Sequence, residues 1–185
     1  MGLRSRSQLK HKRCFFVTTT CNQWLHIFES KPYYDLIINS LNFVSNKYKA
    51  AILGYVMMPN HLHFIVIFNE EENQLSNLMR DLKKFTSTHI RQLIQEAGNK
   101  DLLNKLVHEE KRQKYKIWMD GFDDVWLGKR EIVETKLKYI HNNPLQPHWA
   151  LAEKPTDYPY SSAGFYYLDK PDLINFDTLF RALLI

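Results

Sequence analysis

Hydrophobic and polar positions along the chain predict a mixed α+β protein. The expected strands are runs rich in aromatic and β-branched residues, namely Cys14–Thr20, Ala50–Met58, His61–Phe68 and a stretch within Ile117–Leu127. The expected helices carry apolar residues at helical spacing, and they are Pro32–Lys47, Glu71–Glu96, Leu102–Glu110 and Arg130–Asn143. Pro59-Asn60 predicts a tight turn, since proline fixes φ and asparagine tolerates a positive φ.

The order of these elements predicts the topology. Strand–helix–strand–strand–helix followed by a later strand is the order of a split βαβ, ferredoxin-like antiparallel sheet. We expect helices on one face of this sheet and an open second face that is available for a site. From Pro144 onward the chain is rich in proline and aromatic residues, so we expect an irregular extension with a short closing helix at about 176–184.

Positive charge is concentrated at the start of the chain. The formal net charge is +5, and residues 1–13 hold five basic side chains and no acidic one, so the remaining residues are balanced. The basic side chains are Arg4, Arg6, Lys10, Lys12 and Arg13. We therefore expect a basic arm over 1–13 and one domain over 14–185, with 144–185 as its extension. A nucleic-acid surface in the domain must come from local clusters of charge.

Composition excludes several classes of protein. With 44% hydrophobic residues the chain can bury a core and is not disordered. Its apolar runs, such as Phe64–Phe68, are too short to span a membrane, and no signal peptide is recognisable. Cys14 and Cys21 are seven residues apart, so on one strand they face opposite sides and cannot form a disulfide. A reducing, cytoplasmic compartment is expected.

Two histidines on one strand are the first candidates for chemistry. His61 and His63 are two residues apart, so both imidazoles project from the same face of their strand, while Leu62 and Phe64 project from the other. Such a pair is half of a site for a divalent metal. By itself a His-x-His pair is more often structural, and that alternative stays open at this point.

A tyrosine and an asparagine on a later helix are the second candidates. Tyr139 and Asn143 are four residues apart and share a helix face. The amide oxygen of Asn143 suits Mg²⁺ or Mn²⁺, and the phenol of Tyr139 is a candidate nucleophile. The alternative is an ordinary amphipathic tyrosine. His141 faces away from Tyr139 and is expected to be solvated, and Tyr115 competes as a nucleophile but lacks the Asn-Pro partner.

The order of these motifs resembles the single-tyrosine HUH transposases, and within them the REP-associated tyrosine transposases. The resemblance covers about residues 14–167 and rests on three motifs, Pro-Asn-His-Leu-His at 59–63, Tyr-Ile-x-x-Asn-Pro at 139–144 and Tyr-Pro-x-Ser-Ser at 158–162. It implies a ferredoxin-like domain in which His61, His63 and Asn143 hold Mg²⁺ or Mn²⁺ and Tyr139 is the nucleophile. Such mobile-element enzymes cleave and rejoin single-stranded, hairpin-associated DNA through a 5′-phosphotyrosine, leaving a free 3′-hydroxyl.

Several features of the DNA partnership stay open. The candidate DNA-binding side chains of the domain form two clusters, Lys83 and Lys84 in the long helix and Lys111, Arg112, Lys114 and Lys116 around Tyr115. Basic and aromatic residues together suit single strands, although each cluster can equally be a solvated face. The aromatic residues Trp118, Phe122 and Trp126 are expected in the core. The family includes monomers and homodimers. The alternative function is a non-catalytic ferredoxin-like nucleic-acid-binding module, which needs neither metal ligands nor a nucleophile.

Overall fold

The computed structural model describes residues 13–69, 74–108, 114–172 and 174. Its strands are β1 (Cys14–Thr20), β2 (Ala50–Met58), β3 (His61–Phe68) and β4 (Asp123–Trp126). Its α-helices are α1 (Lys31–Lys47), α2 (Leu75–Glu96), α3 (Lys100–Lys105), α4 (Arg130–Asn142) and α5 (Ala163–Leu168). Short 3₁₀ turns cover Asn22–Trp24, Asn143–Leu145 and Pro155–Asp157.

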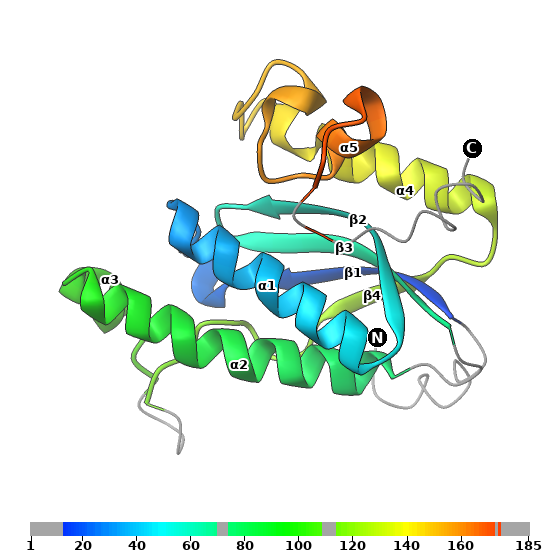
Figure 1. The fold of residues 1–185 in the computed structure, drawn as a ribbon. Coiled ribbons are helices and arrows are strands. Elements are labelled where there is room, and N and C mark those ends of the chain that lie inside the picture. Colours follow the sequence, from blue (N-terminus) through cyan, green and yellow to red (C-terminus); the bar gives the residue numbers. More distant parts are fainter. Residues whose placement is uncertain (1–12, 70–73, 109–113, 173, 175–185) are drawn as a thin grey trace.

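The four strands form one antiparallel sheet in the order β2-β3-β1-β4. Because β1 and β2 each pair antiparallel with β3 between them, they run parallel to each other and α1 connects them as a split βαβ unit (Figure 1). The α+β, ferredoxin-like class predicted from the sequence is confirmed. The central position of β3 gives the histidine pair neighbours on both sides.

Helices α1 and α2 cover one face of the sheet (Figure 1). Alternate residues of β1 and β3 point to this face, where Val17, Leu62 and Phe64 are fully buried. They pack with Leu41 of α1 and Leu82 of α2 in the larger of two apolar clusters. The alternation of the strands with the apolar stripes of the two helices explains why this half of the fold was predictable.

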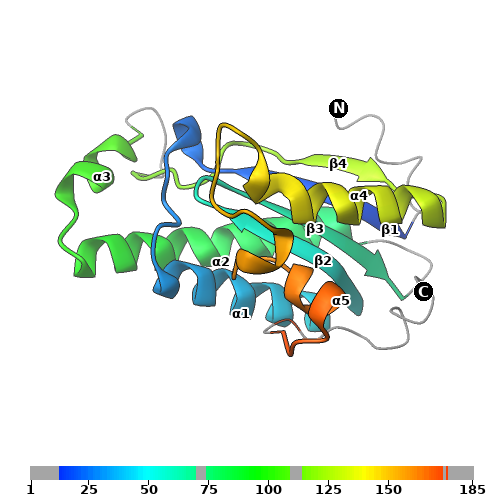
Figure 2. The ribbon, with the colours of Figure 1, turned by 90° about the horizontal axis from the view of Figure 1, so that it is seen from above.

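The other face of the sheet differs from the open face that we expected. Helix α4 and the chain after it lie over it, as Figures 1 and 2 show. The reason is that α4 has an apolar stripe of its own, in which Val133, Leu137 and Ile140 pack against residues such as Ile65. Gly54 permits the close approach, since a Cβ there would lie 2.3 Å from a methyl carbon of Leu137.

The C-terminal extension is more regular than its composition indicated. Residues Ala163–Leu168 form α5, and the chain before it is held along β2, the edge strand of the sheet. The Ser162 backbone N–H donates to the Tyr55 carbonyl at 3.0 Å, and the Tyr158 hydroxyl donates to the Met57 carbonyl at 2.7 Å. The extension therefore caps the edge of the sheet beside α4. The closing helix expected at 176–184 lies outside the described residues.

The helix boundaries differ from the expectation by a few residues. The described part of α2 begins at Leu75, and the helix ends where Gly98 adopts a φ of 66°, as its position indicated. Helix α3 is earlier and shorter than 102–110, because the Asn99 side chain accepts from the Leu102 backbone N–H. The predicted end of α4 is also one residue late, since Asn143 begins a 3₁₀ turn.

Of the three aromatic residues that were expected in the core, two lie there and one does not. Trp118 is 4% exposed and Phe122 packs against the core, but Trp126 is 45% exposed, because β4 is an edge strand. Cys14 and Cys21 are both free and buried, in different apolar clusters, so no disulfide joins them. In the described part of the chain, no helix has the length and apolar character needed to cross a membrane.

Candidate active site

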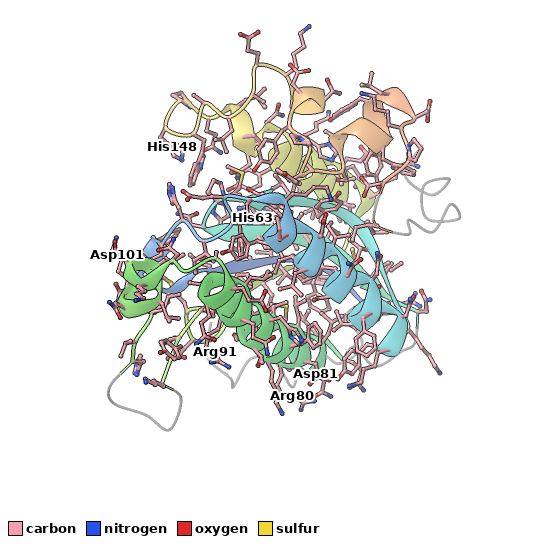
Figure 3. All side chains as sticks on the ribbon, turned by 60° about the vertical axis from the view of Figure 1, so that its left-hand side comes forward. His63, Arg80, Asp81, Arg91, Asp101 and His148 are labelled. Atoms are coloured by element: carbon pink, nitrogen blue, oxygen red, sulfur yellow. The ribbon has the colours of Figure 1, made fainter. Side chains whose placement is uncertain are left out.

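The two histidines are the first and third residues of β3, on the face of the sheet that α4 covers. His61 is paired in register with Thr20 and His63 with Thr18 on the neighbouring strand. The two imidazole centroids are 4.6 Å apart, with the ring planes inclined by 72°. The shared face that the spacing predicted is therefore present, and Figure 3 shows His63 on the sheet below the chain that follows α4.

Each imidazole is oriented through its Nδ1 atom. His61 Nδ1 donates to the Asn60 side-chain oxygen at 2.6 Å, and His63 Nδ1 lies 2.8 Å from the Thr18 hydroxyl. Burial is the main cause that lowers the pKa of His61 to about 4 and that of His63 to about 3. Both rings are consequently neutral near pH 7, and Nε2 is the atom that each would offer to a metal.

Asn143 supplies an oxygen atom next to this pair. It is 3% exposed at the start of the 3₁₀ turn that follows α4. Its side chain contacts His61 closely enough to oppose the lowering of that pKa. Nevertheless, Asn143 Oδ1 is buried, and no described residue forms a hydrogen bond to it with acceptable distance and angle. A buried amide oxygen without a partner is unusual and is typical of a position that receives a ligand.

Tyr139 projects from α4 toward the same place. Its ring centroid is 5.5 Å from that of His63, and the side chain is 42% exposed. The Lys136 ammonium lies 5.2 Å from the Tyr139 ring centroid and 4.6 Å from that of Phe16. We did not single out Lys136 from the sequence, although its three-residue spacing from Tyr139 on a helix places both on one face.

His141 is buried, which contradicts the expected solvated position. It is 1% exposed, with Nε2 2.8 Å from the Ser162 hydroxyl and Nδ1 3.2 Å from the Tyr167 hydroxyl. It does face away from Tyr139, as the helical spacing indicated. The C-terminal extension, which was expected to be irregular, covers it. His141 therefore anchors α4 to the chain that runs along β2.

Two residues after the Asn-Pro motif complete the surroundings of the histidine pair and were missed. The Trp149 ring centroid lies 5.7 Å from that of His61 and 5.5 Å from that of His26. His148 is near enough to His61 to contribute to the lowering of its pKa. Both belong to the Lys-Tyr-Ile-His-Asn-Asn-Pro-Leu-Gln-Pro-His-Trp segment that carries Tyr139, and that proximity in sequence was the available signal.

The histidines have a limited choice of further ligands. No group of three or more His, Cys, Asp and Glu side chains with metal-binding geometry occurs within the described ranges. A metal at this site would therefore need a donor of another type. Asn143 Oδ1 is such a donor, and hard divalent cations accept amide oxygens. Two imidazole nitrogens and one amide oxygen fit a divalent cation, and the oxygen is the donor that Mg²⁺ and Mn²⁺ prefer.

The described members of the two basic clusters proposed for DNA contact lie on the opposite side of the sheet. A cleft of 840 Å³ between α2 and residues 114–122 is lined by basic side chains, among them Arg80, Lys83, Lys84, Arg91, Lys114 and Lys116. Figure 3 shows Arg80 and Arg91 on the side of the molecule away from His148. The cleft thus brings Lys83 and Lys84 together with Lys114 and Lys116, which are distant in the sequence.

The cations in this cleft are not equally available. Lys83 donates to the carbonyls of Met119 and Gly121, both at 2.5 Å, so it ties α2 to the chain before β4. Lys116 forms an ion pair with Asp120 at 2.8 Å. Tyr115, the competing nucleophile, lies in this cleft, where the Lys114 ammonium is 5.6 Å from its ring. Lys111, Arg112 and the arm residues before Arg13 lie outside the described residues.

The fold and this site define a ferredoxin-like domain with a His-hydrophobe-His strand and a tyrosine helix, and comparisons identify its family. The family model described as "Transposase IS200 like" matches residues 14–143, and the chain belongs to this family. The match covers β1 through the first residue of the Asn-Pro turn, which includes both histidines, Tyr139 and Asn143.

One solved structure supports the fold. A REP-associated tyrosine transposase bound to a REP hairpin is similar over 91% of this chain and 90% of its own, with a TM-score of 0.62 and 19% identity. A putative transposase from Deinococcus radiodurans is similar over 71% of this chain and 90% of its own, with a TM-score of 0.45 and 11% identity. No curated protein matches the chain.

Proposed function

We propose that this transposase cleaves and rejoins single-stranded, hairpin-associated DNA through a covalent bond to Tyr139. The observation that supports this most is the meeting of three groups, the histidine pair on β3, Tyr139 on α4 and Asn143 in the turn that follows α4. Tyr139 lies against His63, and the partnerless amide oxygen of Asn143 is buried beside His61. These groups are the donors and the nucleophile that a metal-dependent strand transfer needs, whereas a non-catalytic module needs neither.

His61, His63 and Asn143 would hold a divalent cation, Mg²⁺ or Mn²⁺. Bound there, the cation would neutralise charge on a non-bridging oxygen of the scissile phosphate. Thr18 and Asn60 orient the imidazoles through Nδ1, as outer-shell partners do in metal sites. Burial keeps both rings neutral, which is the protonation state that a metal requires.

The proposed chemistry is a transfer of a phosphoryl group from a 3′ oxygen to a phenol. The Tyr139 oxygen forms a bond to phosphorus and gives up its proton to solvent, while the bond from phosphorus to the 3′ oxygen breaks. The leaving oxygen takes up a proton and becomes a free 3′-hydroxyl, and the other product is a 5′-phosphotyrosine. The Lys136 ammonium stands beside the phenol, where it would stabilise the negative charge that develops.

The substrate assignment rests on the family and on charge. The similar structure described above was solved with a REP hairpin, and we transfer a DNA partner of that kind to this chain as a proposal. Lys84 and Lys114 in the basic cleft, with the arm residues, would contact phosphates, an interaction that weakens as salt rises. Because Tyr139 meets His63 of its own chain, one copy would suffice for cleavage, and a homodimer is not required.

The test is the formation of a covalent protein–DNA adduct. The protein is incubated with Mn²⁺ or Mg²⁺ and single strands taken from the flanks of its own gene, where repeated palindromes are sought, and adducts are separated under denaturing conditions. We expect an adduct for the wild type and for Tyr115→Phe, and none for Tyr139→Phe. An adduct that persists in Tyr139→Phe contradicts the proposal.

The alternative, a nucleic-acid-binding module without catalysis, gives a different result in the same experiment. It predicts salt-sensitive binding of the strand, no dependence on metal and no adduct with any variant. Binding without an adduct, in the presence of both cations and with a palindromic strand, would therefore favour the module over the enzyme.

A further inference from the structure

A second cavity lies next to the histidine pair and has a different character from the basic cleft. Its volume is 610 Å³, within the range of roughly 300–1,000 Å³ that small-ligand pockets occupy. Six of the nine residues that line it carry an aromatic or imidazole ring, namely His26, Phe28, Tyr34, His148, Trp149 and Tyr158. The chain thus forms a cavity walled by flat side chains.

The cavity lies beside the proposed active site. Trp149 is one of its walls, and the Trp149 ring is 5.7 Å from that of His61. Pro59, another wall, lies two residues before the first residue of β3, and its carbonyl accepts from the backbone N–H groups of Ile27 and Phe28 at 2.9 Å. The segment that carries His26 is therefore fixed to the turn that precedes the histidines.

The charge of the cavity argues against a phosphate as its occupant. No lysine or arginine is among the described residues that line it, and the one formal charge is the carboxylate of Glu29. A phosphate would be repelled there. A flat, uncharged group that stacks on rings is favoured instead, and a nucleobase on a single strand is such a group.

We propose that this cavity receives the nucleobase that flanks the scissile phosphate, with Trp149 as the stacking surface. The inference rests on the proposed function, since the phosphate is assigned to His61, His63 and Tyr139. The ring of Trp149 lies near both His61 and His26, so a base that stacks on it in the cavity would place its own phosphate near the histidine pair. Base stacking here would fix which phosphate of the strand reaches Tyr139.

The experiment measures binding, and therefore does not depend on cleavage. Tyr139→Phe is used as the parent, and its affinity for a palindromic strand from the gene flanks is measured by fluorescence anisotropy. An abasic residue is then moved along the single-stranded part, one position at a time. We expect one position at which loss of the base weakens binding by about 5- to 150-fold, the usual range for a stacked base.

Trp149→Ala in the same parent identifies the stacking surface. It is expected to weaken binding of the intact strand and to remove the abasic effect at that one position, because the base has already lost its partner. Trp126→Ala, which changes an exposed tryptophan on β4, is the matched control and should keep the full profile. Trp149→Phe should retain part of the effect, which separates stacking from a folding defect.

An abasic profile that is identical in the Trp149→Ala and control variants would overturn the inference. The proposed function fails in another way, through the absence of a Tyr139 adduct in the wild type. The two failures are thus distinguishable.

Discussion

The two faces of β3 are built from adjacent residues and differ in what they bury. On the face toward α1 and α2, Leu62 and Phe64 are fully buried among apolar side chains. On the face toward α4, His61 and His63 are 7% and 6% exposed, so they are buried almost as well. The first face encloses mainly apolar side chains, although the buried Thr19 hydroxyl beside Leu62 has no hydrogen-bond partner among the described residues. The second encloses two neutral imidazoles and the Asn143 oxygen, which also has no partner there.

We infer that one face of β3 contributes mainly to the stability of the fold and the other face mainly to the proposed function. Burial of apolar area stabilises a fold whatever the site does. Burial of a polar group without a partner opposes folding and persists where the group has another use. Substitutions on the two faces should therefore affect different quantities, in the order given below.

The largest effect is expected for His63→Ala on the α4 face. Loss of one ligand and of its contact with Tyr139 should lower the rate of strand cleavage on the order of 10³-fold, since stabilisation of developing charge is the principal contribution. His89→Ala, which changes a histidine on α2, is the control and should leave cleavage unchanged. Cleavage by His63→Ala within about tenfold of wild type would show that the face is not catalytic.

The next effect is on stability and belongs to the opposite face. Leu62→Ala should lower the free energy of unfolding by about 2–5 kcal/mol, because it opens a cavity in the larger core. His63→Ala, measured with a chelator present, should lower it by less, because relief from burying a polar imidazole offsets part of the ring contacts and of the hydrogen bond that are lost. Urea denaturation measures both, and equal losses would contradict the separation.

A smaller effect is expected where α4 is anchored. Ser162→Ala removes the partner of His141 Nε2 and the acceptor of the Tyr55 backbone N–H at once, so it should be unfavourable by about 1–3 kcal/mol. Because α4 carries Tyr139, adduct formation should slow as well. The control is Ser40→Ala, whose hydroxyl donates only to a backbone carbonyl within α1. If Ser162→Ala has the same melting temperature and the same rate of adduct formation as Ser40→Ala, Ser162 does not anchor α4.

The smallest expected difference between the two faces of the sheet is in the reactivity of the two cysteine thiols. Burial raises the pKa of the Cys14 thiol to about 12 and also raises that of Cys21. A raised pKa means less thiolate, so neither thiol should be alkylated at pH 8.5 as a free cysteine would be. Cys14, in the cluster beneath α4, should react before Cys21 in mild urea, as mass spectrometry of the labelled peptides can show. Simultaneous labelling would mean that the two faces open together.

The sequence predicted the parts of the fold that depend on local pattern. Period-two alternation placed His61 and His63 together, and helical spacing placed Tyr139 and Asn143 on one side of α4. What it could not predict depends on contacts between distant segments. His141 is buried only because residues 158–167 cover it, and Trp126 is exposed only because β4 is an edge strand.

The same limit applies to the site. Trp149 and His26 are far apart in sequence, and their rings meet only after the chain following α4 returns to the β2–β3 turn. The basic cleft likewise unites α2 with residues 114–122, which no periodicity connects. By contrast, Lys136 lies one helical turn from Tyr139, so a search of that helix face would have found it.

The most direct test of the account is to locate the covalent bond to DNA in the wild-type protein. The adduct formed with Mn²⁺ and a palindromic single strand is digested with protease and nuclease, and the peptide that retains a nucleotide is sequenced by mass spectrometry. We predict a 5′-phosphate linked to Tyr139, and no such peptide when a chelator is present. A nucleotide on Tyr115 or on any other residue would contradict the assignment of the α4 face as the catalytic one.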